Sequence, residues 1–338
     1  MRKRLRKNSA DMEKHRINIK EFASRLGIST ATVSRAFGTK GRISEKTRRM
    51  IIAKAEALGY RANYHARNLI SRNSHTIAFF YPPLIKGEPD YFITEIMFGV
   101  SSSTSSNSNP LQIHPIYPES MEFCKDIILN GSISGIIVTA GTPESSELVK
   151  TAKSAGLPYI VIGHMSGEKQ CAVTFDNTRG AMLAGKYFRD TGRKNPAYVG
   201  GIFDRRKRDG FKTGLASLSS KILFDNGGST FHDGYSSFER VIKSAPETDS
   251  VLCANDILAI GFIKAALSNG CKVPEDIAVI GFDDIKIARY FSPALTTVRL
   301  HLDEIGRKSV DLLKRSMNGE KMISGESVEC ELIVRDSA

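Results

Sequence analysis

The chain has 338 residues, of which 41% are apolar and 25% charged, a composition typical of a soluble globular protein with two or three domains. No apolar stretch approaches the roughly 18–20 residues that span a bilayer, and no secretory signal follows the N-terminus, so we expect a cytoplasmic protein without a membrane partner. The net charge of +12 is distributed unevenly along the chain. Residues 1–72 contain 19 Lys/Arg against 5 Asp/Glu, so their net charge is +14 and that of the remainder is −2. A basic N-terminal end of this kind favours a nucleic acid or an anionic surface as its partner.

Residues 1–16 are basic and poor in apolar side chains, which predicts a flexible tail that is disordered without DNA. From residue 17 onward the apolar residues recur every three or four positions, and this spacing predicts three short helices. Gly27 separates the first helix from the second. Ser44 is placed to cap the third helix, and Gly59 is placed to end it.

Ala23, Gly27 and Val33 have the spacing of a helix-turn-helix. Gly27 permits the positive φ of a tight turn, the small Ala23 allows two helices to cross closely, and Val33 packs the second helix onto the first. The outward positions of the second helix carry hydroxyls, a methyl group and a guanidinium, which suit phosphates and base edges in a major groove. These positions are Thr30, Ala31, Thr32, Ser34 and Arg35. A three-helix bundle that binds protein is the alternative, and the charge of this end favours DNA.

Residues 62–73 are polar and basic and include a short helical stretch, which predicts a linker. After residue 74, short apolar strands alternate with amphipathic helices. This alternation predicts parallel sheets with helices on both faces. More than 250 residues of this kind predict two lobes, and the default ligand site is the cleft between them, beyond the carboxyl ends of the strands.

Two groups of motifs occur along the chain. The first group comprises residues 19–35, 44–48, 57–60 and 63–69, and the second comprises residues 176–177, 255–256, 281–284 and 292–298. Together they resemble the lactose/galactose repressor (LacI/GalR) family of bacterial transcription regulators. The first group matches the family's headpiece, third helix and hinge helix, and the second matches its effector domain. The resemblance covers about residues 17–336.

The resemblance implies an N-terminal all-α helix-turn-helix headpiece (17–61), a hinge helix (62–73), and a C-terminal α/β two-lobed effector and dimerisation domain (74–338) with parallel sheets. This last domain would be periplasmic-binding-protein-like. The implied lobes are about 74–163 with 300–323, and about 164–299 with 324–338. The implied protein is a homodimeric repressor associated with the nucleoid. It would bind double-stranded palindromic operator DNA and be controlled by a small-molecule effector such as a sugar or sugar phosphate.

The family also implies how DNA is read. Thr30 and Ala31 occupy the family's base-reading positions. Arg35 occupies a further position that often contacts a base. Asn63 and Arg67 belong to the hinge helix, which would form only on DNA because so short a helix is unstable alone. Leu69 lies where the family inserts a leucine into the minor groove and kinks the duplex. The alternative for Leu69 is packing between two hinge helices.

In the effector domain, Asp283 follows a strand and matches the family's ligand carboxylate, which accepts hydrogen bonds from sugar hydroxyls. The alternative is a turn residue that caps the next helix. Tyr91 and Phe92 match an aromatic pair that can line the cleft, and ordinary core packing is their alternative. Asn255 and Asp256 are expected to serve the fold: Asn255 would orient a strand end, and Asp256 would cap the helix that follows.

The chain departs from the family pattern at three positions, of which two concern the ligand site and one the hinge. Lys207 occupies the position of an arginine that clamps the ligand, and lysine does not replace arginine in bidentate binding. Either Lys207 takes this role or a loop shift brings in Arg206 or Arg208. This basic run suggests an anionic effector such as a sugar phosphate. His164 lies where an aspartate is common, and Ala62 where the hinge often has proline. Because the chain has no tryptophan, stacking on the effector would need Phe or Tyr.

An enzyme and a transporter's substrate-binding protein are the rival readings. The chain has no Gly-rich phosphate loop, no Gly-x-Ser-x-Gly motif and no metal-ligand spacing, and its five cysteines form no Cys-x-x-Cys pair, so we expect no enzyme, no zinc and no cofactor. A binding protein would need an export signal and no basic helix-turn-helix. The C-terminal residues 331–336 are not followed by a leucine-heptad helix, which predicts a dimer and not a tetramer.

Overall fold

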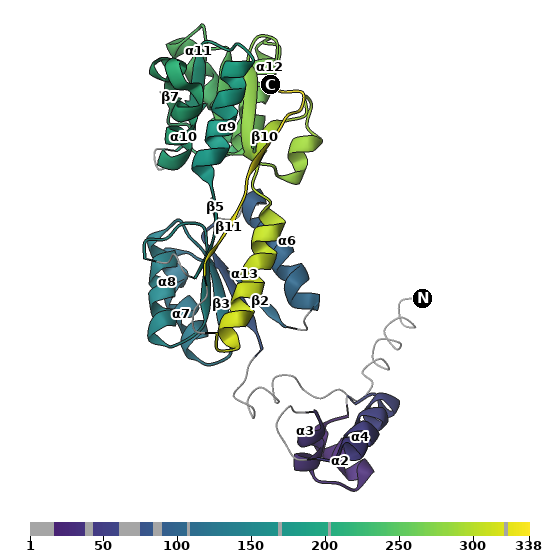
Figure 1. Ribbon diagram of the computed structural model, residues 1–338. Helices are drawn as coiled ribbons and strands as arrows, with labels where there is room; N and C mark the ends of the chain where they lie inside the picture. Colours follow the sequence, from purple (N-terminus) through teal and green to yellow (C-terminus); the bar gives the residue numbers. More distant parts are fainter. Residues whose placement is uncertain are drawn as a thin grey trace, which may run out of the picture. The chain divides into compact units, whose positions relative to one another are not determined.

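A computed structural model of the chain describes residues 17–37, 43–60, 75–83, 90–106, 109–167, 171–201, 204–320 and 324–338. They belong to two compact units, Met1–His75 and Thr76–Ala338, which are drawn in Figure 1. The predicted tail, residues 1–16, and the predicted hinge, residues 62–73, lie outside the described residues.

The described part of the N-terminal unit contains the three short helices expected from the sequence. They are α2 (Ile19–Leu26), α3 (Thr30–Phe37) and α4 (Glu45–Leu58). The side chains of Asn18 and Ser44 accept hydrogen bonds from first-turn amides of α2 and α4, at 3.0 and 3.1 Å. Gly27 and Gly59 end the same helices with φ of 66° and 67°, in the left-handed region that glycine enters without steric cost. The predicted caps and turn are therefore present.

One small apolar core holds these helices together. Phe22, Val33 and Ile51 each supply a fully buried side chain, one from each helix. The ring of Tyr60 stacks on Phe22 with 4.2 Å between the ring centroids. Val33 thus packs α3 against the rest of the unit, as its position in the motif predicts, and the opposite face of α3 is left outward.

Replacing Phe22 with alanine should destabilise the N-terminal unit by about 3–5 kcal/mol, because it removes a buried aromatic ring and leaves a cavity. Ile19→Ala in the same helix is the control. Ile19 is 37% exposed, so its loss should cost roughly 1 kcal/mol. Amide hydrogen exchange of α2, α3 and α4 in the full-length protein measures both effects. Equal losses of protection in the two variants would contradict a core centred on Phe22.

The described residues of the C-terminal unit form two six-stranded sheets. The strands of the first are β1 (Ile77–Tyr81), β2 (Leu111–Pro115), β3 (Gly135–Thr139), β4 (Tyr159–Ile162), β5 (Ala172–Phe175) and β11 (Glu326–Val328). They lie in the order β11-β5-β4-β3-β1-β2, and all of their pairs are parallel.

The strands of the second sheet are β6 (Pro196–Val199), β7 (Leu223–Asp225), β8 (Ser250–Cys253), β9 (Ala278–Asp283), β10 (Thr296–Arg299) and β12 (Glu331–Ile333). Their order is β12-β10-β9-β8-β6-β7. β12 runs antiparallel to β10, and the other pairs are parallel. The predicted α/β architecture with parallel sheets is confirmed, with one antiparallel edge strand.

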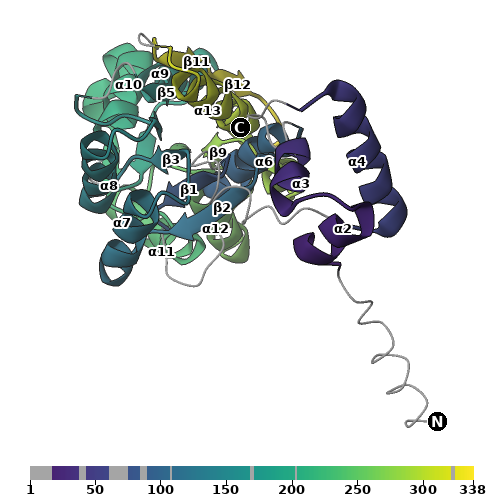
Figure 2. The same cartoon turned by 90° about the horizontal axis from the view of Figure 1, so that it is seen from below.

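Helices cover both faces of each sheet (Figures 1 and 2). Those around the first sheet are α6 (Tyr91–Ser106), α7 (Met121–Leu129), α8 (Pro143–Ser154) and α13 (Leu302–Met317). Those around the second are α9 (Asn177–Asp190), α10 (Arg205–Leu215), α11 (Phe231–Ser244) and α12 (Asp256–Ser268). Short 3-10 helices are η1 (Pro118–Ser120), η2 (Ala216–Lys221) and η3 (Lys286–Arg289). None of the helices in the described ranges is long and apolar enough to cross a membrane.

The burial of β1 shows why helices are needed on two faces. Ile77 and Phe79 belong to the apolar cluster that includes α6, whereas Ala78 and Phe80 belong to the cluster that includes α7 and α8. Figure 2 shows α7 and α8 on one side of β1 and β3, and α6 and α13 on the other. All four of these β1 side chains are fully buried, which explains the unbroken apolar run in the sequence.

The chain passes between the two sheets three times: from β5 to α9, from β10 to α13, and from β11 to β12. Lobe 1 therefore comprises the first sheet with its helices, and lobe 2 the second sheet with its helices. This corrects the lobe boundaries expected from the sequence, which gave β5 and β11 to lobe 2. β5 pairs with β4 directly, through Val161 with Ala172, and β11 extends the same sheet by pairing with β5.

Candidate DNA-binding surface and ligand cleft

The outward face of α3 carries the residues predicted to contact DNA. Thr30, Ala31 and Arg35 are exposed, and Thr32 and Ser34 are half-buried. The Thr32 hydroxyl lies 2.9 Å from that of Ser29, whose oxygen also accepts a hydrogen bond from the Thr32 amide and so caps α3. No described residue forms an ion pair or hydrogen bond with the Arg35 side chain. The structure thus gathers these five positions on one helix with the guanidinium unengaged.

The three hinge residues of the predicted DNA surface are Asn63, Arg67 and Leu69. They lie outside the described residues, so the minor-groove role of Leu69 stays a prediction.

A cleft of about 910 Å³ lies between the carboxyl ends of the two sheets. It is lined by the segments that follow β1, β3, β8 and β9 and by the first turns of α6, α10, α11 and α12. The lining includes all four residues that the sequence predicted for effector binding, Tyr91, Phe92, Lys207 and Asp283. The default site at the strand ends is therefore where the cavity lies.

Asp283 ends β9 with its side chain inside the cleft. It is 6% exposed, and its φ of 111° is a rare conformation for a residue with a side chain. Burial raises the pKa of this carboxyl to about 7, and the nearby charge of Lys207 opposes the rise. Asp283 does not cap the next helix, η3. Ile285 occupies the N-cap position of η3, and no side chain makes a cap hydrogen bond there. The carboxyl accepts no hydrogen bond from a described residue, and it is free for a ligand.

The raised pKa of Asp283 makes stability depend on pH. Its pKa in the unfolded chain is about 4, so the folded state holds this proton more tightly, and stability falls as pH rises from about 4 to about 7. Asp283→Asn removes the cost of burying the charge. The stability of this variant relative to the native protein should grow by on the order of 2–3 kcal/mol between about pH 5 and about pH 8, measured by urea unfolding. A relative stability that does not change with pH would contradict the shift.

Lys207 faces the cleft from the first turn of α10. Its Nζ donates a hydrogen bond to the Ala254 carbonyl at 2.6 Å and lies 4.1 Å from the centroid of the Phe282 ring. Arg208 stacks instead on Phe224, and Arg206 lies outside the cleft lining. The register of α10 thus presents the lysine, and no loop shift brings either arginine into the cleft.

The position of α10 depends on a close approach to α9. A Cβ on Gly210 would lie 2.0 Å from the Thr178 carbonyl oxygen, so only glycine allows this contact. The contact fixes the rotation of α10, and with it the direction of Lys207.

The aromatic pair at the start of α6 lines the cleft. Tyr91 is 41% exposed, and Phe92 is half-buried with its ring edge-on to Phe175 at 6.0 Å. Three further aromatic side chains in the lining, Phe175, Phe231 and Phe291, were not predicted. With no tryptophan in the chain, these rings are the stacking surfaces that the cleft offers.

Sequence reasoning missed two polar groups in the cleft. The Thr139 hydroxyl and the Asn177 side-chain oxygen are buried, and neither has a hydrogen-bond partner among the described residues. Buried polar atoms nearly always have partners, so atoms without them in a cavity indicate ligand contacts. Each residue stands at the end of a strand or just past one, which is the signal that could have singled it out.

Asn255 and Asp256 exchange the roles expected for them. Asn255 caps α12 by accepting a hydrogen bond from the Leu258 amide at 2.7 Å. Asp256 is fully buried and accepts hydrogen bonds from the Ile285 amide, at 2.8 Å, and from the Thr297 hydroxyl. Burial and the charge of Asp283 raise the pKa of Asp256 well above its usual range. Asp256 thus ties α12 to the segment after β9, and the expectation that it caps the helix was wrong.

Asp284 connects the cleft to the segments near the crossings between the lobes. Its side chain is 2% exposed and pairs with Arg299 at 2.7 Å and with Arg335 at 2.6 Å. Arg299 ends β10 just before the chain passes to α13, and it also pairs with Glu331 at 2.9 Å. The φ of Asp284 is 53°, so these two arginines hold a strained backbone directly beside Asp283.

Comparison with known proteins agrees with this architecture. The model of "Bacterial regulatory proteins, lacI family" matches residues 18–63, and that of the periplasmic binding protein-like domain matches residues 186–338. The HTH-type transcriptional repressor CytR of Escherichia coli is 26% identical over 330 residues, 94% of this chain and 95% of the relative. Catabolite control protein A of Priestia megaterium is 27% identical over 327 residues, 91% and 95% of the two chains.

Solved structures share the fold. A lac repressor dimer bound to operator and the anti-inducer ONPF has a TM-score of 0.81 at 20% identity and covers 95% of this chain and 99% of its own. A complex of the regulator CelR with cellobiose has a TM-score of 0.70 at 24% identity, with 96% and 100% covered. The fold and sites define a two-part regulator, with a helix-turn-helix DNA-binding domain and a two-lobed ligand-binding domain. Residues 18–63 match the LacI family of bacterial regulatory proteins, and over 94% of its length the chain is similar to a transcriptional repressor.

Proposed function

We propose that this protein is a repressor that binds palindromic operator DNA as a homodimer, and that a small molecule in the cleft sets its affinity for DNA. The observation that carries the proposal is the presence, in one chain, of a helix-turn-helix with an outward guanidinium and of a cleft in which two buried polar atoms have no partner among the described residues. The similarity to a lac repressor dimer on its operator supports the dimer. A protein with this role acts in the cytoplasm, in association with the nucleoid.

The residues assigned to DNA are the five on α3 together with the three of the hinge. On α3, Thr30 and Ala31 reach base edges, Arg35 contacts a base, and Thr32 and Ser34 position the helix on the backbone. This assignment rests on the exposure of the α3 face and on the similarity to the family.

The charge of the cleft favours an uncharged, hydroxylated ligand. Among the described residues, the cleft lining has four carboxyl groups, Asp90, Asp204, Asp256 and Asp283, against one cation, Lys207, which already donates to the Ala254 carbonyl. An anion would meet this excess of carboxylates, whereas hydroxyl groups can donate to them. The aromatic lining suits the apolar faces of a sugar ring, and similar structures hold cellobiose and ribose. An uncharged sugar is therefore better supported than the sugar phosphate suggested by the basic run.

Thermal unfolding of the purified protein against sugars, sugar phosphates and nucleobases tests the ligand. A ligand at a hundred times its Kd should stabilise the folded state by about 2.7 kcal/mol. Selection of bound sequences from random duplex DNA tests the other half, and a palindromic consensus is expected. Stabilisation by sugar phosphates alone would contradict the charge argument, and the absence of any enriched sequence would contradict the repressor.

A further inference from the structure

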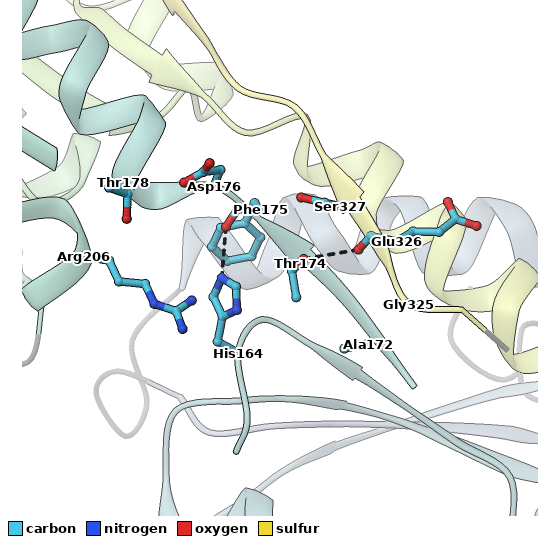
Figure 3. A pocket seen from close by; sticks show the side chains of 10 residues that line it. All are labelled: His164, Ala172, Thr174, Phe175, Asp176, Thr178, Arg206, Gly325, Glu326 and Ser327. Carbon is cyan, nitrogen blue, oxygen red and sulfur yellow. Dashed lines mark hydrogen bonds between the residues drawn. The ribbon is translucent and has the colours of Figure 1, made fainter. Parts of the chain in front are cut away.

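A second cavity, of about 500 Å³, lies where the chain passes between the lobes, and we call it the hinge pocket (Figure 3). Its polar lining residues are His164, Thr174, Asp176, Thr178, Arg206, Glu326 and Ser327. The lining comes from β5, β11 and the segment after β4 in lobe 1, and from α9 and α10 in lobe 2. The hinge pocket and the ligand cleft have one lining residue in common, Phe175, and otherwise have separate walls.

Arg206 is exposed, and among the described residues it is the one cation that lines the hinge pocket. Its guanidinium points across the pocket toward His164 in Figure 3, and it forms no ion pair or hydrogen bond with a described residue. Burial lowers the pKa of His164; the charge of Arg206 adds to this effect, whereas the contact with the Phe175 carbonyl and the charge of Asp176 oppose it. His164 Nε2 lies 3.2 Å from the Phe175 carbonyl oxygen, and this contact orients the ring.

The carboxylates of the hinge pocket are already engaged. Asp176 accepts a hydrogen bond from the Arg179 amide at 2.9 Å and caps α9. Glu326 pairs with Lys308 at 2.8 Å. Neither needs Arg206 as a partner. The hydroxyl of Thr178, in the first turn of α9, makes no hydrogen bond with a described residue and adds a donor on the lobe 2 side of the pocket.

We propose that the hinge pocket binds a small phosphate-type anion, either inorganic phosphate or the phosphate group of a small metabolite, with Arg206 as the main contact and His164 and Thr178 beside it. A guanidinium binds phosphate through two parallel hydrogen bonds, and this geometry makes arginine the side chain best suited to the task. The basic run in α10 then has its anion-binding role at Arg206, outside the cleft, while Lys207 faces the cleft.

The position of the pocket implies a consequence for the cleft. Because both lobes line the pocket, a bound anion favours the lobe arrangement that keeps its contacts together, and Phe175 lies against both cavities. This coupling rests on the proposed function. Anion binding at the hinge pocket does not depend on the proposed function, so a failure of the protein to bind operator DNA would not contradict it.

Isothermal titration of the full-length protein with inorganic phosphate and with glycerol phosphate tests the site. Arg206→Ala should weaken binding by roughly tenfold or more, because hydrogen bonds between charged groups contribute about 1.5–3 kcal/mol. Arg205→Ala is the matched control, since it removes the same charge from an exposed neighbour that lines neither cavity. Tighter binding of glycerol phosphate would identify a metabolite as the source, and tighter binding of inorganic phosphate would identify the free ion.

Three outcomes would overturn the site. They are the absence of binding heat at millimolar phosphate, equal losses in the Arg206→Ala and Arg205→Ala proteins, and a loss that follows Lys207→Met instead. The last would place the anion in the ligand cleft.

Discussion

Asp283→Asn is expected to abolish the response of this protein to its cleft ligand and to leave its binding to DNA without ligand unchanged. The carboxylate is buried, accepts no hydrogen bond from a described residue and faces the cleft. In the proposed ligand complex, this carboxylate accepts hydrogen bonds from hydroxyl groups, and each contributes about 1.5–3 kcal/mol. The loss of two such bonds should therefore weaken ligand binding by roughly a hundredfold or more. The measurement is ligand affinity by titration, together with operator affinity by fluorescence anisotropy with and without ligand.

Asp284→Asn is the natural control, because it alters the adjacent carboxylate. Asp284 is engaged by Arg299 and Arg335, so its replacement removes the ion-pair partner of Arg335 and one of the two partners of Arg299, and it should lower stability by about 3–5 kcal/mol. Asp283→Asn should instead raise stability at neutral pH. A ligand response that survives Asp283→Asn would remove this carboxylate from the site. A similar loss of stability in both variants would show that Asp283 is a structural group.

The sequence predicted the parts of the fold whose causes are local. Gly27, Ser44 and Gly59 act through their own backbone or the next turn, so the boundaries of α2 and α4 followed from residue type. The cleft was predictable for a different reason: parallel strands place their carboxyl ends at one edge, wherever the rest of the sheet lies. Asp283 and Lys207 were therefore found without knowledge of their neighbours.

What could not be predicted depends on contacts between distant segments. β5 and β11 are short, and nothing in their residues tells which sheet they join; only their pairing with each other and with β4 decides it. The missing partners of Thr139 and Asn177 likewise depend on what the other lobe places beside them. The three directions taken by Arg206, Lys207 and Arg208 follow from the rotation of α10 against α9, which the contact at Gly210 sets.

Asp284 shows a further limit of motif reasoning. The second carboxylate after β9 could be noted in the sequence, but its partners lie 15 and 51 positions away along the chain. Its network joins the segment beside Asp283 to β10 and to the C-terminal segment. The two neighbouring carboxylates therefore differ in environment: Asp283 faces the cleft, and Asp284 fixes the backbone that places Asp283 there.

Arg35→Ala should lower the affinity for operator DNA by roughly 5- to 150-fold, because a good arginine contact to a base contributes about 1–3 kcal/mol of discrimination. Affinity for random-sequence DNA should fall much less. Arg35 lies on the outward face of α3 without a partner among the described residues, whereas Val33 and Ala36 hold that helix in place from its buried side. The fold should therefore tolerate the change.

Arg25→Ala supplies the control for charge. Arg25 lies on α2, pairs with Glu21 within its own helix, and leaves the outward face of α3 intact when replaced. Fluorescence anisotropy over a range of salt concentrations separates the two kinds of contact, since each lost phosphate contact reduces the slope of log K against log salt by roughly 0.9. If Arg35 reads a base, Arg35→Ala lowers operator affinity and changes this slope little. An equal loss on both DNAs with a shallower slope would show that Arg35 binds phosphate, and base reading would then rest on Thr30 and Ala31.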